Sequence, residues 1–120
     1  MTTTRQERVK ELLKSEISDI IRLEIKDPRL GFVTVTDAEV SADLQHAKVF
    51  VSVLGDEAQK KDSIRVLQSA ARFVRGEFAK RANMKSTPEI VFMTDTAIEH
   101  GARIFELLEK IKKEDAGEGS

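Results

Sequence analysis

The chain has 120 residues, 40% of them hydrophobic and 34% charged, which suits one globular domain and is too short for two. It contains no cysteine, which excludes disulfides, thiolate nucleophiles and cysteine-based zinc sites and makes the cytosol the expected compartment. The net charge is −1, and no apolar run approaches the roughly 20 residues of a membrane span, so no membrane segment is predicted.

The first predicted element is a helix over residues 5–25. Apolar side chains recur there at intervals of three and four residues, which places them on one face of a helix. These positions are Val9, Leu12, Leu13, Ile17, Ile20, Ile21 and Ile25. Asp27-Pro28 ends the helix, because the residue before a proline avoids the helical region and proline has no amide hydrogen.

Two strands are predicted after this proline. Residues 32–40 are rich in β-branched side chains, and residues 47–54 alternate valines with other residues, as expected of strands. The connection over residues 41–46 is short enough for an antiparallel hairpin.

A long helical stretch is predicted over residues 58–82. Its apolar positions, again three and four residues apart, are Ile64, Leu67, Ala71, Val74 and Phe78. On a straight helix Val66 and Phe73 would lie far from that stripe. A bend at Ala70-Ala71-Arg72 would let Phe73 reach a core, so we expect a kinked helix.

A third strand over residues 89–94 and a last helix spanning Ile98 to Ile111 complete the order. The crossover before the third strand is long enough for that strand to pair in parallel. The predicted fold class is therefore α+β, in the order α-β-β-α-(kink)-α-β-α. Its three-stranded mixed sheet is covered by helices on one face.

Positive charge is concentrated in residues 58–86. Eight lysines and arginines against two acidic residues give this segment a net charge of +6. Five long polar side chains recur every three or four residues and share one helix face: Lys61, Arg65, Gln68, Arg72 and Arg75. A solvated helix face is the alternative, but the concentration of charge favours binding of RNA phosphates. The predicted RNA-binding residues are Lys61, Arg65, Arg72, Arg75, Lys80, Arg81 and Lys85.

The sequence does not predict an enzyme, a metal site or a cofactor. His46 and His100 stand in no metal-ligand spacing, and no glycine-rich nucleotide motif or nucleophile elbow is present. Ser41 and Asp43 lie near His46, but they are the residue types that turns use. A small hydrolase using His46 or His100 remains an alternative hypothesis.

The phenylalanines bear on how RNA is bound. The chain has six phenylalanines and no tryptophan or tyrosine, and the phenylalanines occur in apolar segments. A stacking platform on the sheet, as in RRM domains, is therefore not predicted, and helical cations must carry the binding. A second alternative is a protein-interaction module in which Val66 and Phe73 form an exposed apolar patch.

Three stretches of the sequence resemble a known family. Residues 27–36 read Asp-Pro-Arg-Leu-Gly-Phe-Val-Thr-Val-Thr, residues 47–55 read Ala-Lys-Val-Phe-Val-Ser-Val-Leu-Gly, and residues 101–104 read Gly-Ala-Arg-Ile. Together they resemble bacterial ribosome-binding factor A. The resemblance implies a type-II KH-like fold. Residues 1–112 would form a single KH-like RNA-binding domain, followed by a flexible polar tail at residues 113–120.

The resemblance also implies a function and shows one local departure. It implies a cytoplasmic monomer that binds the free small (30S) ribosomal subunit and its 16S rRNA during late maturation, including 5′-end processing and cold adaptation. The family interrupts its helix at an Ala-x-Gly element, which corresponds here to Ala70, Ala71 and Arg72. Arginine forms helices better than glycine, so a shallower bend is expected, with an added charge where RNA approaches.

Overall fold

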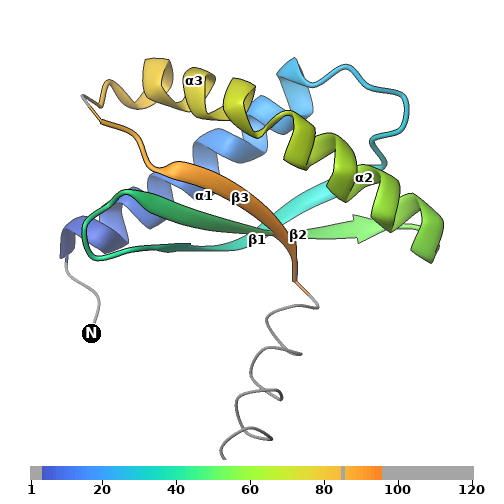
Figure 1. Cartoon of the computed structure of the whole chain (residues 1–120), viewed down its shortest axis with the longest axis horizontal. Helices are drawn as coiled ribbons and strands as arrows, with labels where there is room; N and C mark the ends of the chain where they lie inside the picture. The colour runs from blue at the N-terminus through green and yellow to red at the C-terminus, as the bar shows by residue number, and fades with distance from the viewer. Residues whose placement is uncertain (1–3, 85, 96–120) are drawn as a thin grey trace, which may run out of the picture.

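The computed structural model describes residues 4–84 and 86–95, in which three helices cover one face of a three-stranded sheet (Figure 1). In chain order the elements are α1 (Thr4–Glu24), β1 (Phe32–Val40), β2 (His46–Leu54), α2 (Glu57–Ser69), α3 (Ala71–Ala82) and β3 (Glu89–Thr94). The predicted α+β, KH-like order is confirmed for these elements. The predicted last helix, the tail at residues 113–120 and Lys85 lie outside the described residues.

The sheet has the predicted mixed topology, with strand order β1-β2-β3. β1 and β2 pair antiparallel from Phe32 opposite Leu54 onward, and the register shifts at a bulge between Val35 and Asp37. β2 and β3 pair in parallel. Parallel pairing requires a long crossover between the two strands, and α2 and α3 provide it.

The core lies between the helices and the facing side of the sheet. Ile17 of α1, Val51 of β2 and Phe78 of α3 are completely buried there. Because side chains alternate across a strand, the other face of the sheet carries Phe32 and Leu54, which are 73% and 77% exposed. The helices therefore have one buried side against the sheet and one outer side that is free to carry charge.

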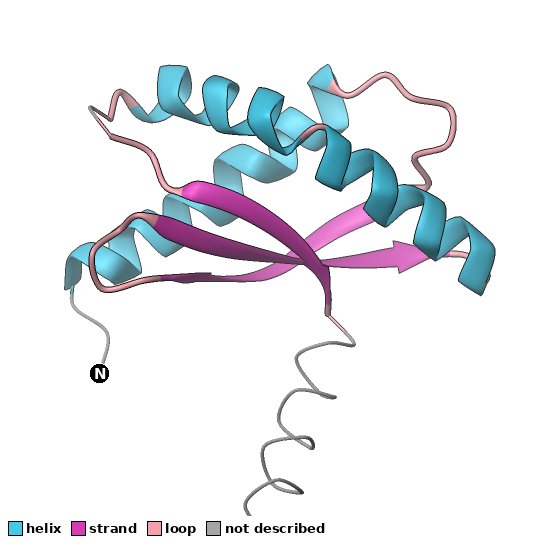
Figure 2. Cartoon of the chain, viewed as in Figure 1, coloured by secondary structure: helices cyan, strands magenta, loops and turns pink. Residues whose placement is uncertain are grey.

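The bend between α2 and α3 is confirmed, and it lies at Ala70 (Figure 2). The Ala70 backbone has φ −88° and ψ 0°, a right-handed conformation, and its N–H bonds the Val66 carbonyl at 2.9 Å. Its φ is negative and lies outside the left-handed region that favours glycine, so the break requires no glycine. Arg72 can therefore stand in the first turn of α3.

The prediction that the bend lets Phe73 reach a core is wrong. Val66 is only 4% exposed, whereas Phe73 is 46% exposed. Val66 is covered because the connection from α1 to β1 lies against its side of α2, where Ile25 lines a shared hollow with it. The bend leaves Phe73 on the same side but nearer the surface. An exposed patch made of both residues does not exist.

Candidate nucleic-acid interface

α2 carries the first half of the basic segment, and local hydrogen bonds fix its start. The Asp56 carboxylate accepts a hydrogen bond from the Gln59 N–H, and the Gln59 side chain accepts one from the Asp56 N–H, both at 2.8 Å. This capping box satisfies two amide groups that a helix start would leave unpaired. One turn later the fully buried Ser63 hydroxyl accepts a hydrogen bond from the Gly31 N–H at 2.8 Å. The outer face of α2 is therefore held in a defined orientation.

Three predicted cations, Lys61, Arg65 and Arg72, form what we call the outer cation row. All three lie on the outer side of the helix pair, and Gln68 is exposed among them. In the part of the chain that the structure describes, no ion pair or hydrogen bond involves their side chains. Like charges that lie unpaired along one helix face repel one another, and a bound polyanion relieves that repulsion. The row therefore suits a chain of phosphates.

The other described members, Arg75, Lys80 and Arg81, are the paired cations of α3. Half-buried Arg75 donates a hydrogen bond from Nη2 to the Thr87 carbonyl at 2.8 Å, which joins α3 to the start of β3. Lys80 Nζ lies 3.3 Å from Glu77 Oε1 on the same helix. These two side chains therefore have protein partners, unlike the outer cation row.

Arg81 is the most constrained of the predicted RNA-binding residues. Its guanidinium lies 3.5 Å from a Glu16 carboxylate oxygen and 3.6 Å from one of Glu24, both on α1. Its side chain is only 27% exposed. Arg81 thus bridges two turns of α1 to the end of α3, which makes it a structural contact as well as a positive charge.

The residues of the suggested hydrolytic set make the contacts of a turn. The Ser41 hydroxyl donates to Asp43 Oδ1 at 2.6 Å and accepts a hydrogen bond from the His46 backbone N–H at 3.0 Å. The Ser41 hydroxyl and the Gln45 N–H together lower the pKa of Asp43. The serine proton is directed to the carboxylate and not to the imidazole, so Ser41 is not arranged as a nucleophile with His46 as its base. Among the described residues no group of three or more potential metal ligands occurs.

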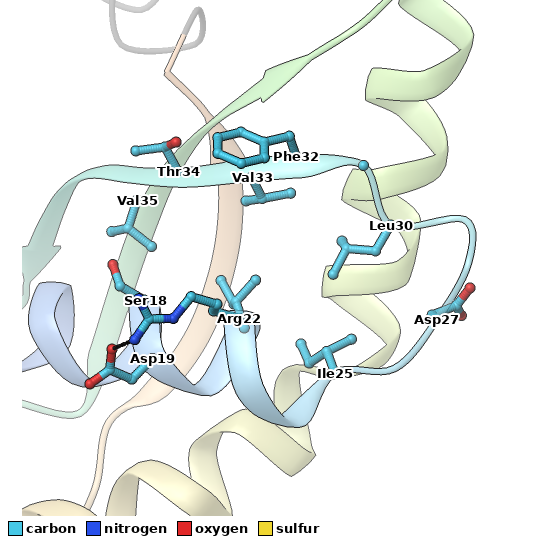
Figure 3. Close-up of a pocket in the computed structure, with 12 residues that line it drawn as sticks. Ser18, Asp19, Arg22, Ile25, Asp27, Leu30, Phe32, Val33, Thr34 and Val35 are labelled. Carbon is cyan, nitrogen blue, oxygen red and sulfur yellow. Dashed lines mark hydrogen bonds and ion pairs between the residues drawn. The ribbon is translucent and has the colours of Figure 1, made fainter.

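A hollow of about 410 Å³ lies between the second half of α1 and the edge strand β1 (Figure 3). Ile25, Leu30 and Val33 are among its apolar lining residues. Arg22 on its wall donates to Asp19 at 2.8 Å, as the dashed line in Figure 3 marks. Two carboxylates, Asp19 and Asp27, line this hollow against the single cation Arg22, so its charge does not favour a phosphate.

The connection from α1 to β1 contributes charges that the sequence analysis did not single out. The Asp27 carboxylate accepts two hydrogen bonds from the Arg29 side chain, at 3.1 and 2.8 Å, and one from the Arg29 N–H at 2.9 Å. The Arg29 side chain, followed by its backbone N–H, lowers the pKa of Asp27 to about 2. In the sequence Asp27-Pro28-Arg29, an acidic and a basic residue flank a proline, and this pattern could have indicated an ion pair within a turn.

The arrangement defines a class: a small KH-like α+β domain with a kinked helix pair that presents a row of unpaired cations. The relatives narrow this class to a family. A sequence model of the family described as Ribosome-binding factor A matches residues 5–108. The chain belongs to the ribosome-binding factor A family.

Individual members of the family are similar to this chain over most of their length. The chain is 56% identical to the ribosome-binding factor A of Desulfitobacterium hafniense over 115 residues, which cover 96% of this chain and 92% of that protein. It superposes on the crystal structure of ribosome-binding factor A from Thermus thermophilus with a TM-score of 0.65 and 26% identity, covering 74% and 94% of the two chains.

A second similar structure comes from a complex with a ribosomal particle. It is a homology model of the Thermus thermophilus factor as fitted into a cryo-EM map of its complex with the 30S subunit. The TM-score is 0.61 at 27% identity, and the match covers 70% of this chain and 88% of that one.

In the described residues of the present chain, no helix is long and apolar enough to cross a membrane.

Proposed function

We propose that this chain is a non-catalytic, cytoplasmic ribosome assembly factor that binds the free small ribosomal subunit and its 16S rRNA as a monomer. It promotes late maturation, including processing of the 16S rRNA 5′ end, and supports growth in the cold. The observation that carries the proposal is the outer cation row, Lys61, Arg65 and Arg72, which is unpaired within the described residues. Membership of a family named for ribosome binding supports it.

The physical basis is electrostatic and needs little rearrangement of the protein. Each arginine offers a planar fork that can bind two phosphate oxygens, and no contact with another described residue has to be broken before it does so. The paired cations extend the positive field, although their contacts with Thr87, Glu77 and α1 restrain them. Lys85 belongs to the same proposed set by charge. We therefore expect affinity to depend mainly on the outer cation row.

Binding can promote maturation without any bond being made or broken by the protein. If the outer cation row contacts phosphates that come together only in one rRNA conformation, binding raises the population of that conformation. The shift can be only as large as the difference in affinity for the two conformations. The expected result is a preference for immature small subunits over assembled ribosomes.

The test is co-sedimentation of the chain with free small subunits and with assembled ribosomes. The unchanged protein should pellet with free small subunits and not with assembled ribosomes. Replacing Arg65 and Arg72 by glutamate should abolish pelleting at moderate salt. A matched control replaces two exposed cations elsewhere, Arg8 of α1 and Lys48 of β2, by glutamate and should retain binding. Equal losses in both double variants would show that net charge, and not the outer cation row, governs binding.

A further inference from the structure

A second hollow, of about 330 Å³, lies beside the α2–α3 break, between α2 and the connection from α1 to β1. Ile25 and Val66 give it apolar walls, and Phe73 stands at its edge with 46% of its surface exposed. Lys26 and Arg29 contribute positive charge from the opposite side. A volume of this size is within the range of small-ligand sites.

The two sides of this hollow are fastened to each other. The Gly31 N–H donates to the Ser63 hydroxyl, and a β-carbon at Gly31 would approach that oxygen to 3.3 Å, so the connection lies very close to α2. A turn closes the connection, since the Leu30 N–H bonds the Asp27 carbonyl at 3.0 Å. A hollow whose walls are already fixed loses little conformational entropy when a ligand binds.

The acidic side chains of the hollow are already engaged. Asp27 accepts two hydrogen bonds from Arg29, and Glu24 lies 3.6 Å from Arg81. Arg29 uses two of its five N–H groups on Asp27 and is 67% exposed, so donors remain for another acceptor. Lys26 is exposed and makes no ion pair within the described residues. The hollow thus combines a flat aromatic face, apolar walls and donors for a phosphate.

We propose that this hollow binds one unpaired nucleotide of RNA, with its base stacked on Phe73 and its phosphate contacted by Lys26 and Arg29. Unstacked bases splayed from single-stranded RNA bind aromatic faces in this way. The site adjoins the outer cation row, because Ser69 of the hollow lies one turn after Arg65 and Phe73 follows Arg72. The inference rests on the proposed function and adds an unpaired base to the phosphates recognised there.

A tryptophan at position 73 provides a direct test. The chain contains no tryptophan or tyrosine, so Phe73→Trp introduces a single fluorophore. A short single-stranded RNA should quench its emission by stacking, and a duplex of the same sequence should not. Phe32→Trp, on the sheet face opposite to the three helices, where Phe32 is 73% exposed, is the matched control and should not respond. Equal quenching of both tryptophans, or quenching by the duplex, would overturn the inference.

Affinity measurements provide a second, independent test. Phe73→Leu keeps an apolar side chain but removes the ring, and should weaken single-stranded RNA binding about 5- to 20-fold. The dependence on salt should stay unchanged, because no phosphate contact is lost. Phe32→Leu should leave affinity unaltered.

The outcomes separate this inference from the proposed function. If Phe73→Leu binds normally and the tryptophan at 73 is silent while free small subunits are still bound, the hollow is not a base site but the proposed function stands. If the unchanged protein fails to bind small subunits, the proposed function fails. Quenching by RNA-free ribosomal proteins, without quenching by RNA, would overturn the inference in favour of a protein partner.

Discussion

The six described RNA-binding candidates of the basic segment divide into two groups that look alike in sequence and differ in structure. The outer cation row, Lys61, Arg65 and Arg72, has side chains with no partner among the described residues. The paired cations of α3 have Thr87, Glu77 or α1 as partners. The comparison shows that a high local density of cations is not enough to identify a binding surface. The cations that have no partner within the protein are the ones that indicate it.

The division also separates two physical roles. A cation already paired inside the protein must give up that contact, or share it, before it binds a phosphate, so its net contribution to affinity is reduced. An unpaired cation at the surface has only water to release. We therefore expect substitutions in the outer cation row to change RNA affinity and substitution of Arg81, which has two carboxylate partners on α1, to change stability.

The largest expected effect is that of Arg72→Met on RNA binding. Methionine retains helix propensity, so only the charge and its hydrogen bonds are lost. Affinity for single-stranded ribosomal RNA should fall about tenfold, and the salt slope should become shallower by about 0.7 to 0.9. The free energy of unfolding should change by less than about 0.5 kcal/mol, because Arg72 is exposed. Filter binding at several salt concentrations and denaturant melts measure the two quantities.

The reverse result is expected for Arg81→Met. Two α1 carboxylates lose their partner, which should lower the free energy of unfolding by about 1 kcal/mol and the melting temperature by about 4 °C. RNA affinity should stay within about twofold. Lys80→Met is the control, since its pair is intrahelical and its side chain is 76% exposed, and should cost under about 0.5 kcal/mol. Loss of affinity without loss of stability would place Arg81 with the outer cation row.

Gly76→Ala tests whether α3 can be made more stable without a change in RNA affinity. A β-carbon at Gly76 would meet nothing within 4 Å, and alanine favours a helix interior. The free energy of unfolding should rise by about 0.5 to 1 kcal/mol with RNA affinity unchanged. The control is Gly31→Ala, whose β-carbon would press on the Ser63 hydroxyl, and it should destabilise. An affinity change in Gly76→Ala would mean that RNA binding requires α3 to move.

Much of the fold could be predicted because its signals are local. The predicted bounds of β1 and β3, residues 32–40 and 89–94, match the observed strands. Each follows a turn signal at Pro28 or Pro88 and contains β-branched residues. The α2–α3 break was predicted at the observed place, but the reason given for it was wrong, because Phe73 remains 46% exposed beyond the break.

The division of the cations could not be predicted, because it depends on contacts between distant segments. Helical spacing places Arg65 and Arg81 on helices but does not reveal that Glu16 and Glu24 pack beside one of them. The same holds for Val66, which the α1–β1 connection covers. Periodicity describes one helix at a time, whereas burial and pairing arise from the way helices pack against their neighbours.

Arg29 belongs to neither group, because it is paired with Asp27 yet 67% exposed. The smallest expected effect concerns the strength of this pair. The lowered pKa of Asp27, about 2 against an ordinary 3.8, means that the pair stabilises the fold above pH 3.8 and is lost as pH falls through 2. An acid titration followed by the NMR shift of the Asp27 carboxyl carbon should give that midpoint. Arg29→Gln should raise the midpoint toward 3.8. A midpoint near 3.8 in the unchanged protein would instead make Arg29 an unpaired cation, whose whole guanidinium is available to phosphate.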